Sequence, residues 1–472
     1  MSKSAIAEVI PHTPADRFAA IGAYGFKKIQ LPILAALVTE DPLLLIGRGG
    51  TGKTYLLNSI SEALGLEHRH YNASLIAFDD LVGFPYPDDA KTEVKFLQTP
   101  ATVWDAESVL IDEISRCKPE HQNRLFSLVH ERRVQGIALD KLRYRWAAMN
   151  PCSPDQDGGE DYTGSEPLDP ALADRFAVIV TVGDWNGYRD DDKKRIVDPA
   201  GEGLVSDDNG TLKADIENWR AEFTDRVERC PRTIIDYTTT LTTALNDAGI
   251  RVSPRRARLL SRTLLATSII NGEFSETVAR VVLKCALPQP AWGELPSRSK
   301  LAAAHRLAWD SACLEGNEKW IHDFLLARKL PAKVKKLLDS CPDPDTGSIA
   351  IEQLLANEPR ERATAFTLAT FPAAVAGKLP IGAEGISDLA RLAGPVMSVS
   401  GNITWQERSN QSGTVHPDKT RYYRTINALE GPRAGRARQL FYWCLVNNVT
   451  VKNPEALESE LNDCVDLIGA SS

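Results

Sequence analysis

The sequence predicts an α/β fold in which a core with a parallel β-sheet is followed by a helical segment and a mainly helical C-terminal domain. Short apolar runs alternate with stretches of helical periodicity early in the chain, and the clearest runs are 43–46, 108–111 and 177–182. Such runs are typical of strands buried on both faces of a parallel sheet. From about Ile216 onward, the apolar residues recur at helical spacing. The expected domains are 1–185 for the core, 186–290 for the helical segment and 291–472 for the C-terminal domain.

The composition indicates a globular chain with more than one domain. Its 472 residues are 43% hydrophobic and 25% charged, which is ordinary for such proteins. The formal net charge of −8 argues against a protein that mainly coats nucleic acid. Eight cysteines occur without a C-x-x-C pair, so we expect reduced thiols and neither a zinc module nor a disulfide framework. No apolar segment has the length of a signal peptide or a membrane span, and we therefore expect a cytoplasmic protein.

The first expected element is a helix at 13–40, where apolar residues recur at roughly helical spacing. The pattern stops at Glu40-Asp41-Pro42, just before the strand at 43–46. A glycine-rich stretch follows that strand, and an amphipathic helix opens directly after it at Tyr55. The stretch consists of Gly47, Arg48, Gly49, Gly50, Thr51, Gly52, Lys53 and Thr54.

This stretch matches the phosphate-loop pattern G-x-x-x-x-G-K-[ST] in the strand-to-helix context that the pattern requires. Several backbone N–H groups and the positive end of a helix dipole then point at one place, where a polyphosphate can bind. The glycines let the backbone bend round the anion, and Lys53 reaches the β- and γ-phosphates. The Thr54 hydroxyl is placed to bind Mg²⁺. The sequence therefore predicts a magnesium-dependent polyphosphate site.

The second expected strand, 68–72, carries His68 and His70 on one side. Two readings stay open for this pair, a metal site or a hydrogen-bonded or solvated pair. No third ligand follows at a useful spacing, which favours the second reading.

Residues 84–105 then read as an excursion from the α/β core, because the next clear strand begins only at Ser108.

That next strand ends in the acidic pair Asp112-Glu113, which we interpret as the second part of the site. An acid at the end of a neighbouring strand holds Mg²⁺ through water, and a second carboxylate beside it polarises the attacking water. Asn150 stands at the end of a further apolar stretch and is a candidate to orient the same water. Its alternative is a turn residue before Pro151.

The remaining core elements follow in order. Residues 134–139 and 142–146, separated by Asp140-Lys141, read as a β-hairpin whose second arm continues to Asn150. A short helix at 170–176 precedes the last core strand at 177–182. Residues 184–215 are polar and are expected to form an irregular linker.

The helical segment contains the motif Ser253-Pro254-Arg255-Arg256, with Ser253 as N-cap and Pro254 at the first helical position. Two cations at a helix N-terminus oppose the helix dipole, and a bound anion would offset that cost. The alternative is an exposed arginine pair with acidic neighbours.

The C-terminal domain contains helical stretches but no catalytic motif that we identify. Aromatic and arginine residues interleave near its end, which allows either stacking on nucleic acid or, as the acidic chain favours, a solvated face beside an aromatic core. These residues are Arg421, Tyr422, Tyr423, Arg424, Arg433, Arg436, Arg438 and Trp443.

Taken together, these motifs resemble AAA+ ATPases, specifically the MoxR-like branch with a helix-2 insert. The resemblance covers residues 15–290 and rests on the order of five motifs, which are the phosphate loop, L-I-D-E, M-N-P, L-D-P-A-L-A-D-R-F and S-P-R. The segment from Asp112 to Arg116 is similar to the D-E-I-N-R motif of that branch, with Ser115 where asparagine is usual.

The resemblance implies a role for each motif. Gly47 to Thr54 becomes Walker A and Asp112-Glu113 becomes Walker B, which together bind ATP and Mg²⁺, with Tyr55 counted among the nucleotide-binding residues. Asn150 becomes sensor 1, Arg175 the arginine finger, and Arg255 the expected sensor 2, in preference to Arg256. Arg116 is a candidate second interface arginine, and 84–105 would hold the helix-2 insert.

The implied activity is ATP hydrolysis by a homo-oligomeric ring, expected to be a hexamer, because Arg175 lies too far from its own nucleotide. The helical segment at 186–290, which we call the lid, carries Arg255. Hydrolysis is then expected to rotate the lid against the core. Members of this branch resemble chaperones that remodel or activate a protein partner, some with a von Willebrand A domain protein. Two alternatives remain: a nucleic-acid-dependent motor, which the acidic charge opposes, and an ATP-gated scaffold, which the intact catalytic residues oppose.

Overall fold

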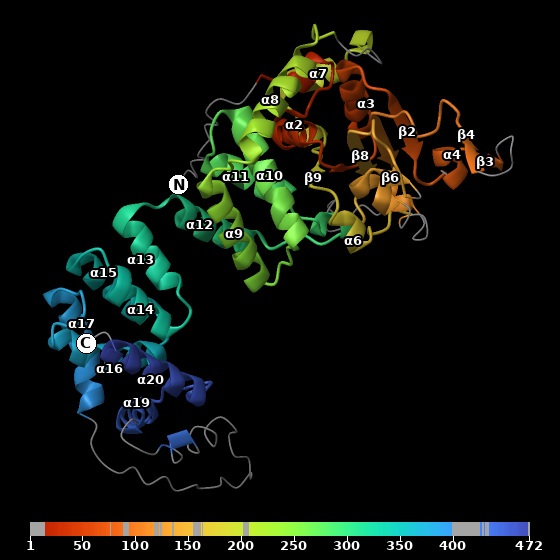
Figure 1. Ribbon diagram of the computed structural model, residues 1–472. Helices are drawn as coiled ribbons and strands as arrows, with labels where there is room; N and C mark the ends of the chain where they lie inside the picture. Colours follow the sequence, from red (N-terminus) through yellow and green to blue (C-terminus); the bar gives the residue numbers. More distant parts are fainter. Residues whose placement is uncertain are drawn as a thin grey trace. The chain divides into compact units, whose positions relative to one another are not determined.

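The computed structural model describes residues 15–75, 77–87, 94–117, 122, 125–134, 136–153, 162, 164–201, 207–398, 425–426, 429 and 434–470 (Figure 1). The chain divides into two compact units, Met1–Ala312 and Cys313–Ser472. The first unit extends beyond residue 290 because α12 (Arg298–Cys313) contributes Ala304 and Ala308 to its hydrophobic core.

A five-stranded parallel sheet forms the centre of the first unit, which confirms the predicted fold class. Its strand order is β2-β5-β8-β1-β9, with β2 at His68–Asn72, β5 at Ser108–Asp112, β8 at Tyr144–Met149, β1 at Leu43–Ile46 and β9 at Val178–Thr181. Leu43 of β1 is level with Trp146 of β8 and with Val178 of β9. The carboxyl ends of these strands therefore lie along one edge of the sheet.

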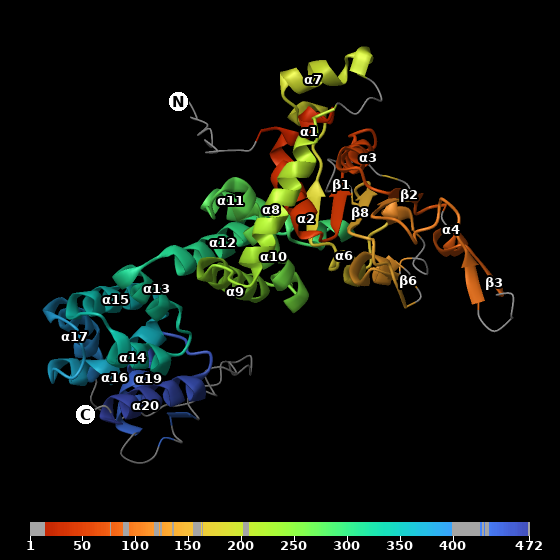
Figure 2. The same cartoon turned by 45° about the horizontal axis from the view of Figure 1, so that its top comes forward.

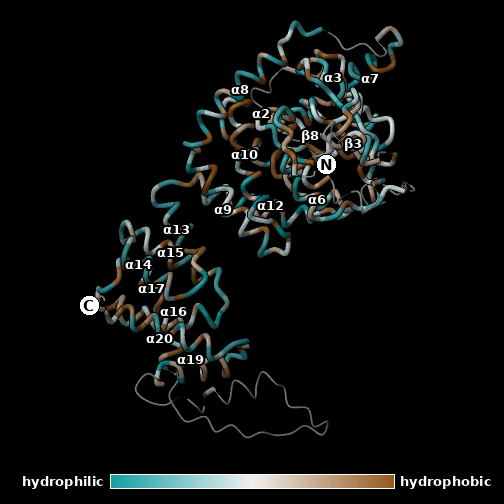
Figure 3. The backbone as a smooth tube through the Cα atoms, turned by 45° about the vertical axis from the view of Figure 1, so that its right-hand side comes forward, coloured by the Kyte–Doolittle hydropathy of each residue, from teal (hydrophilic) through white to brown (hydrophobic). Residues whose placement is uncertain are grey.

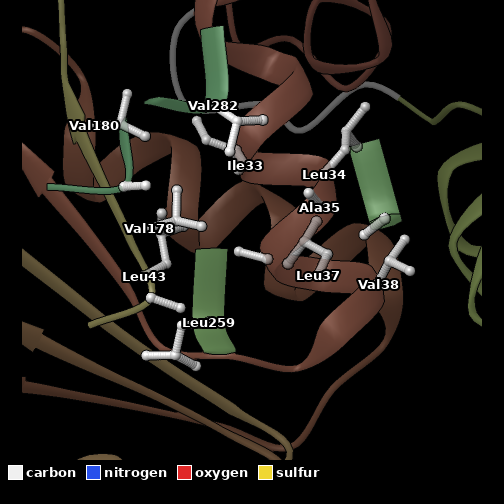
Figure 4. Packing of buried hydrophobic residues seen from close by; sticks show 14 of the residues in the cluster. Ile33, Leu34, Ala35, Leu37, Val38, Leu43, Val178, Val180, Leu259 and Val282 are labelled. Carbon is white, nitrogen blue, oxygen red and sulfur yellow. The ribbon is translucent and has the colours of Figure 1, made fainter. Parts of the chain in front are cut away.

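Alternate residues of β1 serve two separate hydrophobic cores, as expected for a strand buried on both faces. Leu43 and Leu45 pack with the lid-side core, while Leu44 and Ile46 pack with the core on the opposite face. Figure 4 shows the first of these, where side chains of α2 (Gln30–Thr39) meet Val178, Leu259 and Val282. The sheet is thus covered on both sides.

Helices of the first unit surround this sheet (Figures 1 and 2). Beside α2 and α12 they are α1 (Arg17–Ala20), α3 (Lys53–Leu64), α4 (Phe78–Val82), α6 (Pro170–Ala173), α7 (Asp190–Ile196), α8 (Thr211–Val227), α9 (Arg232–Asp247), α10 (Pro254–Asn271) and α11 (Glu276–Cys285). Short 3₁₀ or π turns are η1 (Lys27–Ile29), η2 (Ile114–Arg116), η3 (Ser127–Glu131), η5 (Trp185–Gly187), η6 (Pro199–Gly201) and η7 (Gln289–Trp292). Ser253 caps α10 as predicted, since its Oγ accepts a hydrogen bond from the Arg256 N–H at 3.0 Å.

The structure corrects the single helix expected at 13–40. It contains α1, η1 and α2 instead, separated by a turn with Gly22 at φ 86° and Gly25 at φ 88°. Positive φ angles of this size end a helix and are readily adopted only by glycine. The apolar periodicity did not reveal this break.

The predicted hairpin at 134–146 is also wrong in its pairing. A small antiparallel hairpin joins β6 (Arg133–Val134) to β7 (Ile137–Ala138), and β8 instead enters the core sheet between β5 and β1. All six residues of β8 are buried, which suits a central parallel strand and not the arm of an exposed hairpin.

The expected linker at 184–215 contains regular structure in its described part. It includes α7, which has three aspartates in its first turn and Lys193, Lys194 and Arg195 in its last turn. This charge order complements the helix dipole and was a signal for a helix. The expected insert at 84–105 forms an antiparallel pair of strands, β3 (Phe84–Pro87) and β4 (Val94–Leu97), with 88–93 outside the described residues.

The second unit is helical and has its own hydrophobic core. Its helices are α13 (Gly316–Leu326), α14 (Leu330–Ser340), α15 (Pro344–Asn357), α16 (Arg360–Val375), α17 (Ala383–Met397), α19 (Ala434–Val446) and α20 (Pro454–Ala470). Hydrophilic and hydrophobic residues alternate along these helices (Figure 3), as expected for amphipathic elements around one core. Among the described residues, no helix has the length and apolar character needed to cross a membrane.

Candidate functional site

The glycine-rich loop lies where the sequence predicted it, between the end of β1 and the start of α3. Gly52 immediately precedes α3 with φ 79°, a conformation that strongly favours glycine. A Cβ added at Gly47 would lie 3.0 Å from the Val182 Cβ, so the loop also passes close to the end of β9. Loop and helix together present the backbone N–H groups that bind phosphate in such turns.

Lys53 is held inside this loop. Its Nζ donates hydrogen bonds to the carbonyl oxygens of Gly47 at 2.7 Å and Arg48 at 2.8 Å, and to the Asn150 Oδ1 at 3.3 Å. The residue is only 7% exposed, and this burial lowers the pKa of the ammonium group. Phosphate oxygens are stronger acceptors than these neutral oxygens, so Lys53 is placed to exchange them for a nucleotide.

Thr54 and Asp112 meet at the same edge of the sheet. The Thr54 Oγ1 donates to the Asp112 Oδ2 at 2.8 Å, and the Glu113 N–H donates to Oδ1 at 2.9 Å. Burial alone raises the pKa of the Asp112 carboxyl, but hydrogen bonds from His70, Thr54 and the Glu113 backbone outweigh it and lower the pKa. A hydroxyl and an ionised carboxylate at this spacing fit the oxygen ligands that Mg²⁺ prefers, with Thr54 bound directly and Asp112 through water.

Glu113 and Asn150 follow the adjacent strands β5 and β8. Glu113 has φ 51°, which is uncommon for a residue with a side chain, and its Oε2 lies 3.6 Å from the Arg116 Nε. The Asn150 Oδ1 accepts a hydrogen bond from Lys53 of the loop. Glu113 and Asn150, the two residues expected to act on the attacking water, therefore both lie at the loop. Arg116 contacts Glu113 of its own chain.

The two histidines of β2 have different surroundings. His68 Nδ1 lies 2.8 Å from the Ser108 Oγ and Nε2 lies 3.1 Å from the Asn58 Oδ1, while burial lowers its pKa to about 4. His70 Nε2 is 3.5 Å from the Asp112 Oδ2. Within the described part of the chain, no group of three or more His, Cys, Asp or Glu residues is arranged to hold a metal. The hydrogen-bonded reading of this pair is the one that the structure supports.

A cavity of about 630 Å³ opens beside the loop and was not foreseen from the sequence. Its aromatic lining comes from Tyr24, Phe26, Tyr55 and Tyr188, and Arg195 of α7 lies over the Tyr24 ring with its Cζ 5.3 Å from the centroid. Aromatic faces next to a phosphate loop suit a purine base. Of these residues only Tyr55 was predicted, because the others lie in the turn that divides the first helix and near α7, in the expected linker.

Replacement of Tyr188 by alanine is expected to weaken ATP binding about tenfold, the loss of one base-stacking contact of 1–3 kcal/mol. Binding of inorganic tripolyphosphate should change little, since it has no base. Isothermal titration with both ligands measures the difference. Equal losses for ATP and tripolyphosphate would show that the cavity does not hold the base.

Arg175 lies at the opposite end of the sheet from the loop. It follows α6 and precedes β9, whose first residue is level with the first residue of β1. The four residues of β1 therefore separate Arg175 from the loop by about 13 Å along the strand. Its guanidinium lies 4.4 Å above the Phe126 ring, and Nη1 donates to the Ala171 carbonyl oxygen at 2.6 Å. Figures 1 and 2 likewise show α6 apart from α3.

The structure distinguishes the two arginines of the S-P-R motif. Arg256 is 1% exposed and donates hydrogen bonds to the carbonyl oxygens of Ala173, Phe176 and Ala177. Burial lowers the pKa of Arg256 to about 10. Arg255 instead is partly exposed, and its Nη1 lies 3.3 Å from the Asp174 Oδ2. Arg255 is therefore the more accessible of the two, whereas Arg256 joins α10 to the core, and the role of Arg255 as sensor 2 stays a prediction.

Arg255 and Arg175 belong to the same region of the surface. Burial lowers the pKa of Arg175, and the positive charge of Arg255 lowers it further. Arg255 forms an ion pair with Asp174, and Arg175 is the next residue of the chain after Asp174. The geometry therefore groups the expected sensor 2 with the expected arginine finger and away from the loop of the same chain.

Substitution of Arg256 by methionine is expected to destabilise the first unit by about 3 kcal/mol or more, since it removes the buried donor to the Phe176 and Ala177 carbonyl oxygens and breaks the ion pair with Asp174. Arg255→Met is the matched control, because it removes the same group from a partly exposed site. Urea denaturation compares the two free energies of unfolding. Equal stabilities would contradict the structural role given to Arg256.

The lid helices are bound firmly to the core of the same chain. Arg220 of α8 donates to the Leu37 carbonyl oxygen at 2.7 Å, and the Arg262 Nε of α10 lies 2.9 Å from the Asp41 Oδ2. Residues of α2, α8 and α10 also share one hydrophobic core. The expected rotation of the lid against its own core would have to break these contacts, and it stays a prediction.

Comparison with known proteins agrees with this geometry. A sequence profile described as the AAA domain, dynein-related subfamily, matches residues 42–176, which include the loop, Asp112, Glu113, Asn150 and Arg175. Residues 42–176 of the core therefore match the AAA domain family. The prediction of a AAA+ ATPase of MoxR type is confirmed at the level of this domain family, and nucleotide binding with Mg²⁺ is typical of it.

Two further proteins resemble the chain. A Bacillus subtilis (strain 168) protein named uncharacterized protein YeaC is 27% identical over 165 residues, which are 34% of this chain and 48% of that protein. The chain thus spans about half the length of this curated relative. A solved structure from Cytophaga hutchinsonii ATCC 33406, described as a "putative ATPase", covers 57% of this chain and 83% of its own, with 18% identity and a TM-score of 0.43. Neither likeness assigns a role to a residue here.

Proposed function

We propose that this AAA+ protein hydrolyses ATP in a homo-oligomeric ring, a hexamer, in which Arg175 and Arg255 of one copy complete the site of its neighbour. The observation that carries the proposal is the division of the catalytic residues between two places. Lys53, Thr54, Asp112, Glu113 and Asn150 gather at the carboxyl edge of the sheet. Arg175 and Arg255 lie at the other end, where only a neighbouring copy can use them.

In this arrangement each group has one task. Lys53 leaves the Gly47 and Arg48 carbonyl oxygens to bind the β- and γ-phosphates, while Thr54 and Asp112 hold Mg²⁺. Glu113 accepts a proton from the attacking water, which Asn150 orients. The neighbour's guanidinium groups stabilise the charge that spreads over the transferring phosphoryl group.

We further propose that the ring remodels or activates a protein partner, with a von Willebrand A domain protein as a candidate cofactor protein. Support comes from apolar side chains that two hairpins expose to solvent. Phe84 is 61% exposed, Tyr86 45% and Leu97 53% on the β3–β4 pair, and Ile137 is 46% exposed on β7. Exposed apolar residues in such groups are typical of protein-binding surfaces.

The test is ATP turnover across a series of protein concentrations, with the mass in solution recorded with and without ATP. We expect the activity per chain to rise together with a ring-sized species, and Glu113→Gln to form the species without turnover. Full activity in a species that stays monomeric at every concentration would reject the shared site. Strong stimulation by DNA or RNA that falls steeply with salt would instead favour a nucleic-acid motor.

A further inference from the structure

A second cavity, of about 720 Å³, lies between α11 and α12 and is separate from the ATP site. Both helices line it with one face, since the lining positions on α11 are 276, 280, 283 and 284, and those on α12 are 298, 301, 302, 305 and 306. These are helical spacings of three and four residues. The opposite faces of the same helices, including Val282 and Ala308, are buried in the core. Figures 1 and 2 show α11 beside α12.

The walls of this cavity combine aliphatic and cationic side chains. Leu283, Leu287, Leu295 and Leu301 supply aliphatic surface. Four cations lie among them, and they are Arg280, Lys284, Arg298 and Arg306. The lining contains one carboxylate, Glu276, which is already paired with Arg280 at 2.6 Å and lies 3.4 Å from the His305 Nε2.

Three of these cations lack a partner of opposite charge. Among the described residues, no carboxylate forms an ion pair with Lys284, Arg298 or Arg306, and all three are exposed. The chain as a whole is acidic, with a net charge of −8, so this excess of positive charge is local. A cavity of this kind attracts anions and offers aliphatic contacts to whatever carries them.

The spacing of the charges limits the ligand. Arg298 and Arg306 are eight residues apart on one helix face, which places their Cα atoms about 12 Å apart along the axis. A ligand with a single anionic group, such as a fatty acid, can satisfy only one of them. A nucleotide has several charges on one short chain but needs a surface for its base, and the imidazole of His305 is the one aromatic ring among the lining residues. An extended peptide spans about 12 Å in four residues.

We propose that this cavity binds a short acidic peptide segment of a partner protein, with aliphatic side chains in the cavity and carboxylates on Lys284, Arg298 and Arg306. The lining of this cavity shares no residue with the cavity beside the loop, and Thr181 at the carboxyl end of β9 also belongs to it. The cavity therefore gives the chain a docking point for a partner that does not require nucleotide turnover.

The experiment uses the full chain and a short fluorescent peptide that alternates glutamate and leucine. We expect saturable binding by fluorescence anisotropy, which a glutamine-for-glutamate peptide and a serine-for-leucine peptide both lose. Arg298→Glu combined with Arg306→Glu should weaken binding at least about tenfold, since two attractive pairs become repulsive. Lys335→Glu combined with Lys378→Glu is the matched control, because it changes the net charge equally at exposed positions of the second unit and should leave binding unchanged.

ATP turnover is measured on the same variants, because this distinguishes a loss of peptide binding at this cavity from a loss of ATP hydrolysis. Loss of peptide binding with turnover retained supports the proposal, and retained peptide binding in the Arg298→Glu/Arg306→Glu variant overturns it. Equal weakening in the control variant would show attraction by net charge alone and would also overturn it. Dodecanoate binding without peptide binding would assign the cavity to a lipid-like anion and reject a peptide.

Discussion

We expect Lys53→Ala to abolish ATP binding, with a loss of affinity of at least about hundredfold. Two charge-assisted hydrogen bonds, to the β- and γ-phosphates, disappear with the ammonium group, and each such bond contributes about 1.5–3 kcal/mol. Lys53 lies inside the loop, where its Nζ donates hydrogen bonds to the Gly47 and Arg48 carbonyl oxygens and to Asn150. Equilibrium binding of a fluorescent ATP analogue measures the change.

Folding has to be separated from binding in this experiment, since Lys53 is buried. Thermal melting of the variant should show the same cooperative transition as the parent protein. Thr54→Ala provides a second control, because it removes a magnesium ligand and should weaken binding only when Mg²⁺ is present. Tight ATP binding by folded Lys53→Ala protein would reject the assignment of the loop.

Arg175→Ala is expected to leave ATP binding intact and to lower the hydrolysis rate by about 10³–10⁵-fold, the contribution of an arginine supplied in trans. The reason is positional, since Arg175 lies a full strand length from the loop of its own chain and cannot contribute to binding there. Single-turnover kinetics and ATP binding measured on the same preparation separate the two effects. Arg229→Ala, at an exposed arginine on the C-terminal side of α8, is the control for loss of a positive charge.

Mixing two inactive variants tests whether Arg175 acts in trans. A copy with Arg175→Ala keeps Glu113, and a copy with Glu113→Gln keeps Arg175. Where these two copies meet in a mixed ring, one of the two possible arrangements combines the intact Glu113 of the first copy with the intact Arg175 of the second. We expect partial recovery of turnover that depends on the mixing ratio. Mixed rings that form, as shown by mass, and remain inactive would count against a site shared between copies.

The positions of the residues expected to bind phosphate and magnesium could be predicted because they depend on local sequence. The loop at 47–54 and the pair Asp112-Glu113 each directly follow an apolar strand, and parallel strands bring their carboxyl ends together. The same reasoning placed Asn150 correctly even though the strand before it was assigned to a hairpin. A central strand and a hairpin arm have similar apolar patterns, and only burial of both faces separates them.

Other features depend on contacts between distant segments, which one sequence does not reveal. Tyr24 and Tyr188 meet at the base cavity although more than half of the core separates them in sequence. Arg255 and Arg256 are adjacent and chemically identical, and their different roles follow from which one points at the carbonyl oxygens after α6. The break at Gly22 and Gly25 depends on backbone angles that apolar periodicity does not record.

The contacts of Arg220, Arg256 and Arg262 bear on how mechanical work is done. They join the lid to the core of the same chain, so a rotation of the lid within one chain would have to break them. In the ring that we propose, the movement would then take place at the boundary between two copies of the chain. In that ring, we expect a substitution that weakens these lid contacts to uncouple ATP hydrolysis from the movement of a bound partner.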